Sequence, residues 1–248
     1  MSVWVLGCAG SSFDPELREP CSGYLVEYHN AALLLDCGYG TFDSYRTLSL
    51  KEDLCAIVIS HAHRDHCGDL ARFLQCVPAG HEAPVVVASA ESLEAIGETL
   101  NEFECQVIVV KSASRVSLGP FVVELSATTH QIPTLAANVR AGGHSLVYSA
   151  DTGPGWGVPR EWRGADTAVV ECTYLTRGAT SWPYHLAVDD ALDLAREINA
   201  ERTLLTHVPP REDPHRRLEL AREREPTLSF DLAERGGQYP VARGDDYR

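Results

Sequence analysis

The sequence has 248 residues, of which 44% are hydrophobic and 23% are charged, a composition that is typical of a globular protein and excludes a disordered or fibrous chain. Its 35 acidic and 21 basic residues give a net charge of −14, which disfavours nucleic acid as a partner in the absence of a local basic patch. Eight cysteines without a Cys-x-x-Cys pair exclude a disulfide scaffold and a ribbon-type structural zinc site.

The first half of the chain alternates short strand patterns with two helix patterns. The pair His29-Asn30 predicts a hairpin turn. Leu33–Leu35 shows no polar alternation, which predicts a strand buried on both faces. Strands are expected over Val3–Leu6, Gly23–Tyr28, Ala31–Asp36, Ala56–Ser60, Val85–Ala88 and Cys105–Val110, and helices over Gly68–Cys76 and Ala90–Leu100.

The second half is rich in strand patterns and ends in helices. Strands are expected over Arg115–Leu118, Phe121–Ala127, Leu135–Arg140, Ser145–Ser149, Thr167–Glu171 and Thr203–Thr206, and helices over Val188–Ile198 and Pro214–Arg224. Two blocks of strands, each followed by helices, predict two sheets packed face to face with helices outside. The fold class is therefore α+β, a four-layer αββα sandwich formed by residues 1–248 as one domain.

Two further features bear on location and partners. No apolar run approaches the roughly 20 residues that a membrane span needs, and Met1–Gly7 lacks the pattern of a signal peptide. We therefore expect a cytoplasmic protein with no membrane partner and with a small molecule as its substrate, and a homodimer is compatible with these features. The basic residues around Arg216 and Arg217 alternate with glutamates, which predicts a solvated helix face.

The strongest motif is His61-Ala62-His63-Arg64-Asp65-His66, which directly follows a buried strand. Alternate residues of a loop point to the same side, so His61 and His63 can hold one ion while Asp65 and His66 turn towards a second. Imidazole and carboxylate are the ligands expected of zinc, with manganese or iron as alternatives.

Six residues cannot complete two metal shells, so further ligands are expected at the ends of later strands. His130, Asp151 and His207 each follow an apolar run directly, at the edge where a sheet presents side chains to a cleft. Their shared placement makes them the candidates for the remaining ligands.

The order Asp36-Cys37-Gly38, then the histidine motif, His130, Ser149–Thr152 and Thr206-His207, resembles the metallo-β-lactamase superfamily over nearly the whole chain. The resemblance implies a hydrolase with two divalent metal ions. By it, one ion would be held by His61, His63 and His130, the other by Asp65, His66 and His207, with Asp151 between them. Asp36 would accept a hydrogen bond from a ligand, and Asp65 would also orient the attacking water.

Two later segments, Val169–Tyr174 and Tyr184–Ala187, resemble those that carry a glutamate–histidine pair in ribonuclease Z and related cyclic phosphodiesterases. The pair would be Glu171 and His185, with the histidine protonating the leaving oxygen. The chain departs from ribonuclease Z where Leu186-Ala187 replaces a Ser-Thr pair. It departs again between His130 and Asp151, where there is room for one strand pair and its turn but not for the long tRNA-binding arm.

Two enzymatic functions follow. The first is a phosphodiesterase for a small or cyclic phosphodiester, and tRNA is not expected as a substrate. The alternative is an acyl hydrolase, meaning a thioesterase or lactonase, that uses the same metal site. A metal-binding protein without turnover is disfavoured by the additional acid pair. A weaker hypothesis is that the amides of the glycine-rich turn Gly7–Ser12 face a phosphate, although the turn lacks the lysine of a P-loop.

Overall fold

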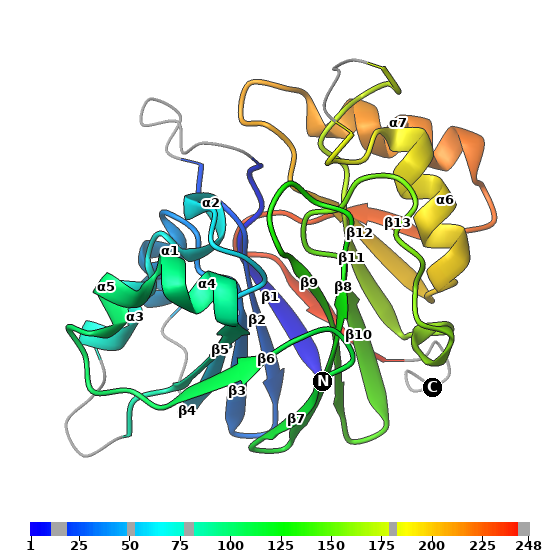
Figure 1. The fold of residues 1–248 in the computed structure, drawn as a ribbon. Helices are drawn as coiled ribbons and strands as arrows, with labels where there is room; N and C mark the ends of the chain where they lie inside the picture. The colour runs from blue at the N-terminus through cyan, green and yellow to red at the C-terminus, as the bar shows by residue number, and fades with distance from the viewer. Residues whose placement is uncertain (11–18, 49–52, 77–81, 179–182, 243–248) are drawn as a thin grey trace.

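The structure is a computed structural model that describes residues 1–10, 19–48, 53–76, 82–178 and 183–242. Within these ranges, two seven-stranded sheets face each other and helices cover their outer faces (Figure 1). This arrangement is the α+β four-layer sandwich that the sequence predicts.

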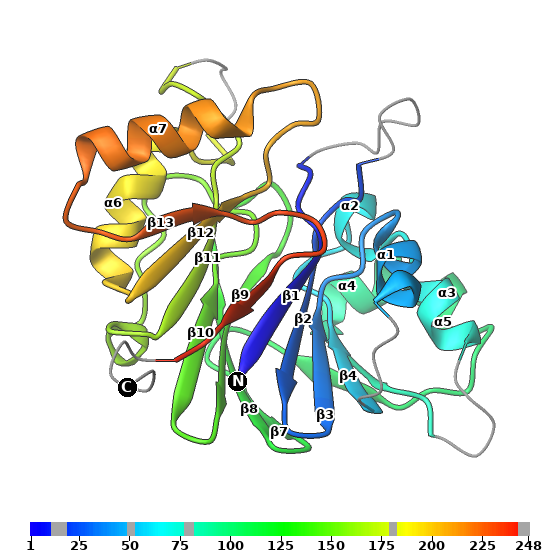
Figure 2. The ribbon, with the colours of Figure 1, turned by 180° about the vertical axis from the view of Figure 1, so that it is seen from behind.

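The first sheet is built mainly from the N-terminal half of the chain. Its β3 strand is almost fully buried because both faces are covered, which explains the missing polar alternation. The C-terminal β14 returns to pair with β1, as Figure 2 shows for the red end of the chain. In sheet order the strands are β14 (Gln238–Pro240), β1 (Ser2–Gly7), β2 (Gly23–Tyr28), β3 (Ala31–Leu35), β4 (Asp53–Val58), β5 (Val85–Ser89) and β6 (Val107–Val110).

The second sheet begins with antiparallel hairpins and ends with parallel strands. Its β8 strand alternates strictly, so that Phe121, Val123 and Leu125 point into the core. In sheet order the strands are β13 (Phe230–Leu232), β12 (Arg202–Thr206), β11 (Thr167–Glu171), β10 (His144–Tyr148), β9 (Leu135–Ala141), β8 (Phe121–Ala127) and β7 (Arg115–Leu118).

Helices flank the two sheets separately (Figure 1). On the first sheet lie α1 (Thr41–Thr47), α2 (Arg64–Cys67), α3 (Leu70–Gln75), α4 (Ala90–Ala95) and α5 (Gly97–Leu100), and on the second lie α6 (Val188–Ile198) and α7 (Pro214–Arg224). The helix expected over Ala90–Leu100 is interrupted at Ile96, just before Gly97, a residue type that disfavours a helix interior. The helix expected over Gly68–Cys76 is shorter and begins after Asp69.

The core between the sheets draws residues from both of them, and two buried tyrosines cross it in opposite directions. Tyr24 of β2 hydrogen-bonds Thr206 at the end of β12, while Tyr148 of β10 donates to Asp36 after β3. The two rings contact each other with centroids 5.1 Å apart. These contacts tie together the strand ends of the two sheets. No helix of the described residues is both long and apolar enough to cross a bilayer.

Candidate metal centre

All seven residues expected to bind metal lie together at one edge of the two sheets, in loops that follow strands and, for Asp65 and His66, in the short helix α2. Asp151 and His207 follow the parallel strands β10 and β12, and the histidine motif follows β4. Asp36, Ala150 and His207 have φ angles of 59°, 51° and 59°. Residues other than glycine rarely adopt this left-handed conformation, and it is concentrated at functional sites.

The first group of donor atoms comprises three imidazoles and one carboxylate oxygen. His61 Nε2 and His130 Nε2 lie 3.0 and 3.3 Å from His63 Nδ1. Asp151 Oδ2 lies 3.6 Å from His61 Nε2 and 3.8 Å from His130 Nε2. The four side chains therefore surround one small space, with a donor atom from each facing it.

The second group lies on the other side of the Asp151 carboxylate. His66 Nε2 and His207 Nε2 are 3.4 Å apart, and Asp65 Oδ2 lies 3.8 and 3.5 Å from them. Asp151 Oδ1 lies 3.2 Å from His66 Nε2 and 3.3 Å from His207 Nε2. One oxygen of Asp151 thus faces each group, the geometry expected of a bridging carboxylate.

These residues fit divalent cations. Ligands at about 2.0–2.1 Å in a tetrahedron lie about 3.3 Å apart, and the pairs of donor atoms given above are separated by 3.0–3.8 Å. The buried Oδ1 of Asp151 makes no hydrogen bond with any residue that the structure describes, despite the two nearby imidazoles. Burial disfavours a charged carboxylate, but the surrounding histidines hold the pKa of Asp151 well below its usual range. The group is therefore an anion ready to accept a cation.

Asp36 lies behind the donor atoms and is fully buried. Its Oδ2 accepts from His66 Nδ1, Ser60 Oγ and Tyr148 Oη, each at 2.7 Å, and its Oδ1 accepts from the Ser60 amide at 2.7 Å. Because Nδ1 of His66 carries a proton and donates it in a hydrogen bond to Asp36, the Nε2 lone pair of that ring is left for an ion.

Glu171, at the end of β11, is a second buried carboxylate with four donors. Its Oε1 accepts from the Thr152 amide at 2.6 Å and from His185 Nδ1 at 3.1 Å. Its Oε2 accepts from Thr173 Oγ1 at 2.7 Å and from the Leu186 amide at 3.1 Å. Glu171 therefore joins the chain after Asp151 to the loop that carries His185.

His185 borders both groups of donor atoms, and 20% of its side chain is exposed. Burial disfavours the charged ring, but the Glu171 carboxylate raises the pKa of His185 to about 9. The preceding residue is also used, since the Tyr184 carbonyl accepts from His130 Nδ1 at 3.0 Å. This loop therefore orients a metal-ligand candidate and the acid candidate together.

Arg217 is the clearest residue that sequence reasoning missed, because the expected solvated helix face is wrong at this position. Its side chain is only 1% exposed. It donates to the carbonyls of Cys172, Thr173 and Asp213 and pairs with Glu212. Arg217 thereby fixes the backbone just after Glu171. Its neighbour Arg216 is exposed, as expected.

The phosphate-binding hypothesis for the glycine-rich turn is also wrong for its described part. The amides of Cys8 and Ala9 donate to the Pro20 carbonyl, and the Gly10 amide donates to Val208. A Cβ on Gly10 would lie 2.6 Å from Nδ1 of His207. Glycine is needed here for close approach to a ligand candidate, and Ser11 and Ser12 lie outside the described residues.

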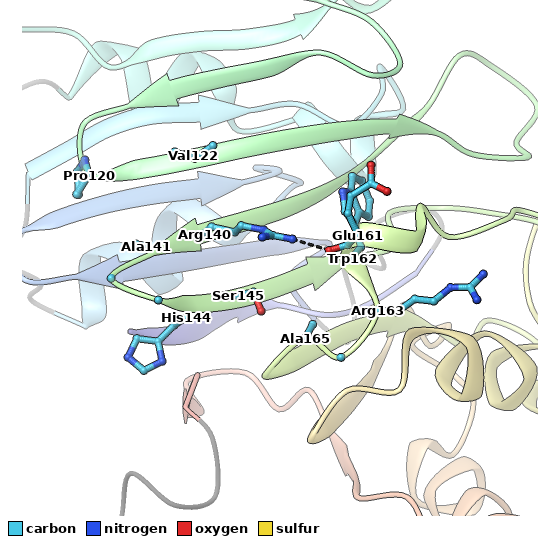
Figure 3. Close-up of a pocket in the computed structure, with 13 residues that line it drawn as sticks. Pro120, Val122, Arg140, Ala141, His144, Ser145, Glu161, Trp162, Arg163 and Ala165 are labelled. Atoms are coloured by element: carbon cyan, nitrogen blue, oxygen red, sulfur yellow. Dashed lines mark hydrogen bonds between the residues drawn. The ribbon is translucent and has the colours of Figure 1, made fainter.

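A cavity of about 410 Å³ lies at the opposite end of the second sheet, beside the β9–β10 hairpin (Figure 3). His144, which lines it, begins the strand that Asp151 follows, so the cavity is remote from the donor atoms. Arg140 spans part of it and donates to the Glu161 carbonyl at 2.6 Å. The cavity therefore has no part in the chemistry of the metal centre.

Comparison with known proteins is consistent with this geometry. A family model described as "Beta-lactamase superfamily domain" matches residues 31–208. The chain belongs to the metallo-β-lactamase superfamily. The superfamily is hydrolytic and the groups of donor atoms described above could hold metal ions, so the protein is a metallo-hydrolase, as predicted.

Individual superfamily members resemble the chain over most of its length. The Bacillus subtilis protein named "Probable metallo-hydrolase YhfI" is 27% identical over 216 residues, which cover 84% of this chain and 87% of that protein. The crystal structure of YhfI superposes with a TM-score of 0.84 at 25% identity, covering 96% of this chain and 98% of that one. A diphosphatase of the PhnP family and the short form of human tRNase Z, each 19% identical with a TM-score of 0.74, share the fold; they cover 96% and 98% of this chain and 95% and 100% of their own.

Proposed function

We propose that this metallo-hydrolase is a phosphodiesterase that uses two divalent metal ions to hydrolyse a small or cyclic phosphodiester. The observation that carries the proposal is the Glu171–His185 pair, which lies directly beside the two groups of donor atoms. A phosphodiester with an alkoxide leaving group needs a proton donor, and this pair supplies one.

His61, His63 and His130 would hold one ion, and Asp65, His66 and His207 the other, with Asp151 shared between them. Five imidazoles and two carboxylates best suit zinc, with manganese or iron as alternatives. Ions bound in this way would activate a water molecule and neutralise charge on the phosphoryl oxygens.

The protein's own residues would then position and move protons. Glu171 occupies Nδ1 of His185, so the second ring nitrogen is left to protonate the leaving oxygen. Asp65 faces the second group of donors and would orient the attacking water. Asp36 would keep His66 in the orientation and tautomer that an ion requires.

The proposed substrate is small for two reasons. Between His130 and Asp151 the chain forms only the β9–β10 hairpin and its connections, so the expected strand pair fills this stretch and leaves no arm there. The net charge of −14 also opposes a large polyanion, whereas two bound cations would reverse the local field for a small phosphodiester. We therefore propose a small-molecule substrate rather than tRNA.

A substrate panel on the pure, metal-loaded protein tests the proposal. It contains a 3′,5′-cyclic nucleotide, a cyclic ribose phosphate and bis-p-nitrophenyl phosphate, beside a thioester and a lactone. We expect turnover of phosphodiesters that is lost in His63→Ala, which identifies the metal centre as its source. Turnover of the thioester or lactone without any phosphodiester would instead establish the acyl hydrolase.

A further inference from the structure

Two histidines of the metal centre reach a buried carboxylate through a hydroxyl group. The ring of His207 contacts the hydroxyl of Thr173, which is hydrogen-bonded to Glu171. On the other side of the centre, the ring of His61 contacts the hydroxyl of Ser60, which is hydrogen-bonded to Asp36. The same three-part arrangement therefore occurs once in each group of donor atoms.

The hydrogen bonds of Thr173 determine which nitrogen of His207 carries the proton. A hydroxyl has one proton to donate, and Thr173 Oγ1 donates it to Glu171 Oε2 at 2.7 Å. His207 Nδ1 lies 2.8 Å from Thr173 Oγ1. Because the proton of that hydroxyl is already donated to Glu171, Nδ1 must be the donor in this second contact. The Nε2 atom, which faces Asp65 and Asp151, is then left with its lone pair.

We infer that Thr173 is a positioning residue that fixes the tautomer of His207 and couples this ligand to the carboxylate that holds His185. The inference rests on the proposed metal site, because the tautomer matters most to an ion at Nε2. One carboxylate, Glu171, thus governs both the binding of one ion and the orientation of the acid.

The surroundings of Thr173 keep its hydroxyl in place. The residue is only 4% exposed, so water does not readily replace the contact. Arg217 holds its carbonyl at 2.7 Å, and Gly10 lies against the His207 ring on another side. Both partners of this hydrogen bond are therefore buried and held by their neighbours.

Thr173→Val tests the inference because valine keeps the shape and removes the hydroxyl. Thr173→Ser restores the hydroxyl on a smaller side chain. Thr167→Val is a matched control, since Thr167 lies on the adjoining strand β11, is equally buried, and its hydroxyl has no hydrogen-bond partner among the described residues. Ser60→Ala removes the corresponding hydroxyl from the opposite group.

Cobalt(II) titration of the metal-free proteins, followed by visible absorption and calorimetry, measures the affinity of each site. Loss of a group that orients a metal ligand typically weakens binding 10–100-fold. We expect Thr173→Val to weaken one of two ions by this factor, and Ser60→Ala to weaken the other. Thr173→Ser and Thr167→Val should bind both ions as the wild type does.

Long-range proton–nitrogen spectra of metal-free protein with labelled histidine report the tautomer directly. We expect His207 to carry its proton on Nδ1 in the wild type and Thr167→Val, and to shift towards Nε2 in Thr173→Val. A wild-type proton on Nε2, or unchanged tautomer and cobalt affinity in Thr173→Val, would overturn the inference. A wild type that binds no cobalt would instead refute the proposed metal site, while the tautomer would still decide the role of Thr173.

Discussion

The imidazole rings of His185 and His207 lie stacked, with centroids 5.2 Å apart and planes 19° apart. His207 points its Nε2 at the second group of donor atoms, and His185 is held at Nδ1 by Glu171. A substrate oxygen that reaches the donor atoms is therefore also within reach of the His185 ring. This proximity is what makes general-acid assistance testable.

His185→Ala should slow hydrolysis of an alkyl phosphodiester far more than that of bis-p-nitrophenyl phosphate. An alkoxide needs a proton to depart, and such assistance is typically worth about 10²–10⁴-fold, whereas p-nitrophenolate departs with little help. The measurement is kcat/KM for both substrates, with metal content determined on the same samples. Equal losses on both substrates at unchanged metal content would remove His185 from the acid role.

Glu171→Gln should show the same dependence on leaving group more weakly, because His185 remains present. Since Glu171 also accepts from Thr173, this variant should in addition bind one ion less tightly, which His185→Ala should not. Metal titration of the two variants separates these effects. Identical metal affinities in both would show that Glu171 acts on His185 alone.

Metal analysis of the pure protein should find close to two transition-metal ions per chain, because two groups of donor atoms share Asp151. A chelator should abolish activity. His63→Ala should lose activity by about 10²-fold or more while circular dichroism remains unchanged, since His63 is only partly buried and lies outside the core. One ion or fewer under metal-replete conditions would contradict the dinuclear site.

Arg217→Met should lower the free energy of unfolding by about 3 kcal/mol or more, since it leaves buried carbonyls of Cys172 and Thr173 without their donor. Arg216→Met is the matched control on the same helix, because its pair with Glu219 is exposed and contributes less than about 1 kcal/mol. Urea unfolding measures both changes, provided that the m-value, the slope of the free energy of unfolding against urea concentration, is the same in each protein. Similar small losses in the two variants would argue against the buried clamp.

Stability should fall as the pH rises above 9. Burial raises the pKa of Cys172 to about 12, whereas a thiol in the unfolded chain has its ordinary pKa of about 9.0. Between these values the unfolded state releases a proton that the folded state retains, so stability present below pH 9 is lost as pH rises. Between pH 8 and 10, the free energy of unfolding of Cys172→Ala should therefore decrease by about 1 kcal/mol less than that of the wild type, as measured by urea unfolding. Cys76→Ala, which removes an exposed thiol, should show the same decrease in the free energy of unfolding as the wild type.

Transfer-RNA precursors should be neither bound at physiological salt nor cleaved at the 3′ end. The β9–β10 hairpin occupies the stretch where an arm would be inserted, and the net charge of −14 repels a polyanion. Gel-shift and cleavage assays with a metal-loaded sample, beside an active tRNase as positive control, measure this. Accurate 3′ cleavage at an enzymatic rate would refute the small-substrate proposal.

The sequence was sufficient to predict the fold class and the convergence of the seven candidate ligands. The histidine motif is dense enough to be recognised alone, and His130, Asp151 and His207 were identified by their places directly after apolar strands. Strands β8, β10 and β12 run in the same direction within the second sheet, so their carboxyl ends lie at one edge and this positional signal carries over to three dimensions.

The residues behind the ligands were not predictable in the same way. Thr173 and Ser60 are ordinary hydroxyl residues whose roles depend on which carboxylate folds against them. Arg217 occurs in a helix pattern that also fits a solvated surface, and only the approach of two strand-end carbonyls makes burial favourable. Short strands such as β14, with three residues, carry too little periodicity to be recognised.

The two tyrosines that cross the core also connect the interior to the chemistry. Tyr24 hydrogen-bonds Thr206, the residue just before His207. Tyr148, from the opposite sheet, hydrogen-bonds Asp36. Each group of donor atoms combines side chains that follow strands of both sheets, so the distance between the sheets sets the spacing of the donor atoms within each group. A change of volume among core side chains far from these residues would therefore alter how closely the donor atoms of each group approach one another. In this molecule the packing of the interior is a determinant of catalytic geometry, and substitutions there would change reaction rate and stability separately.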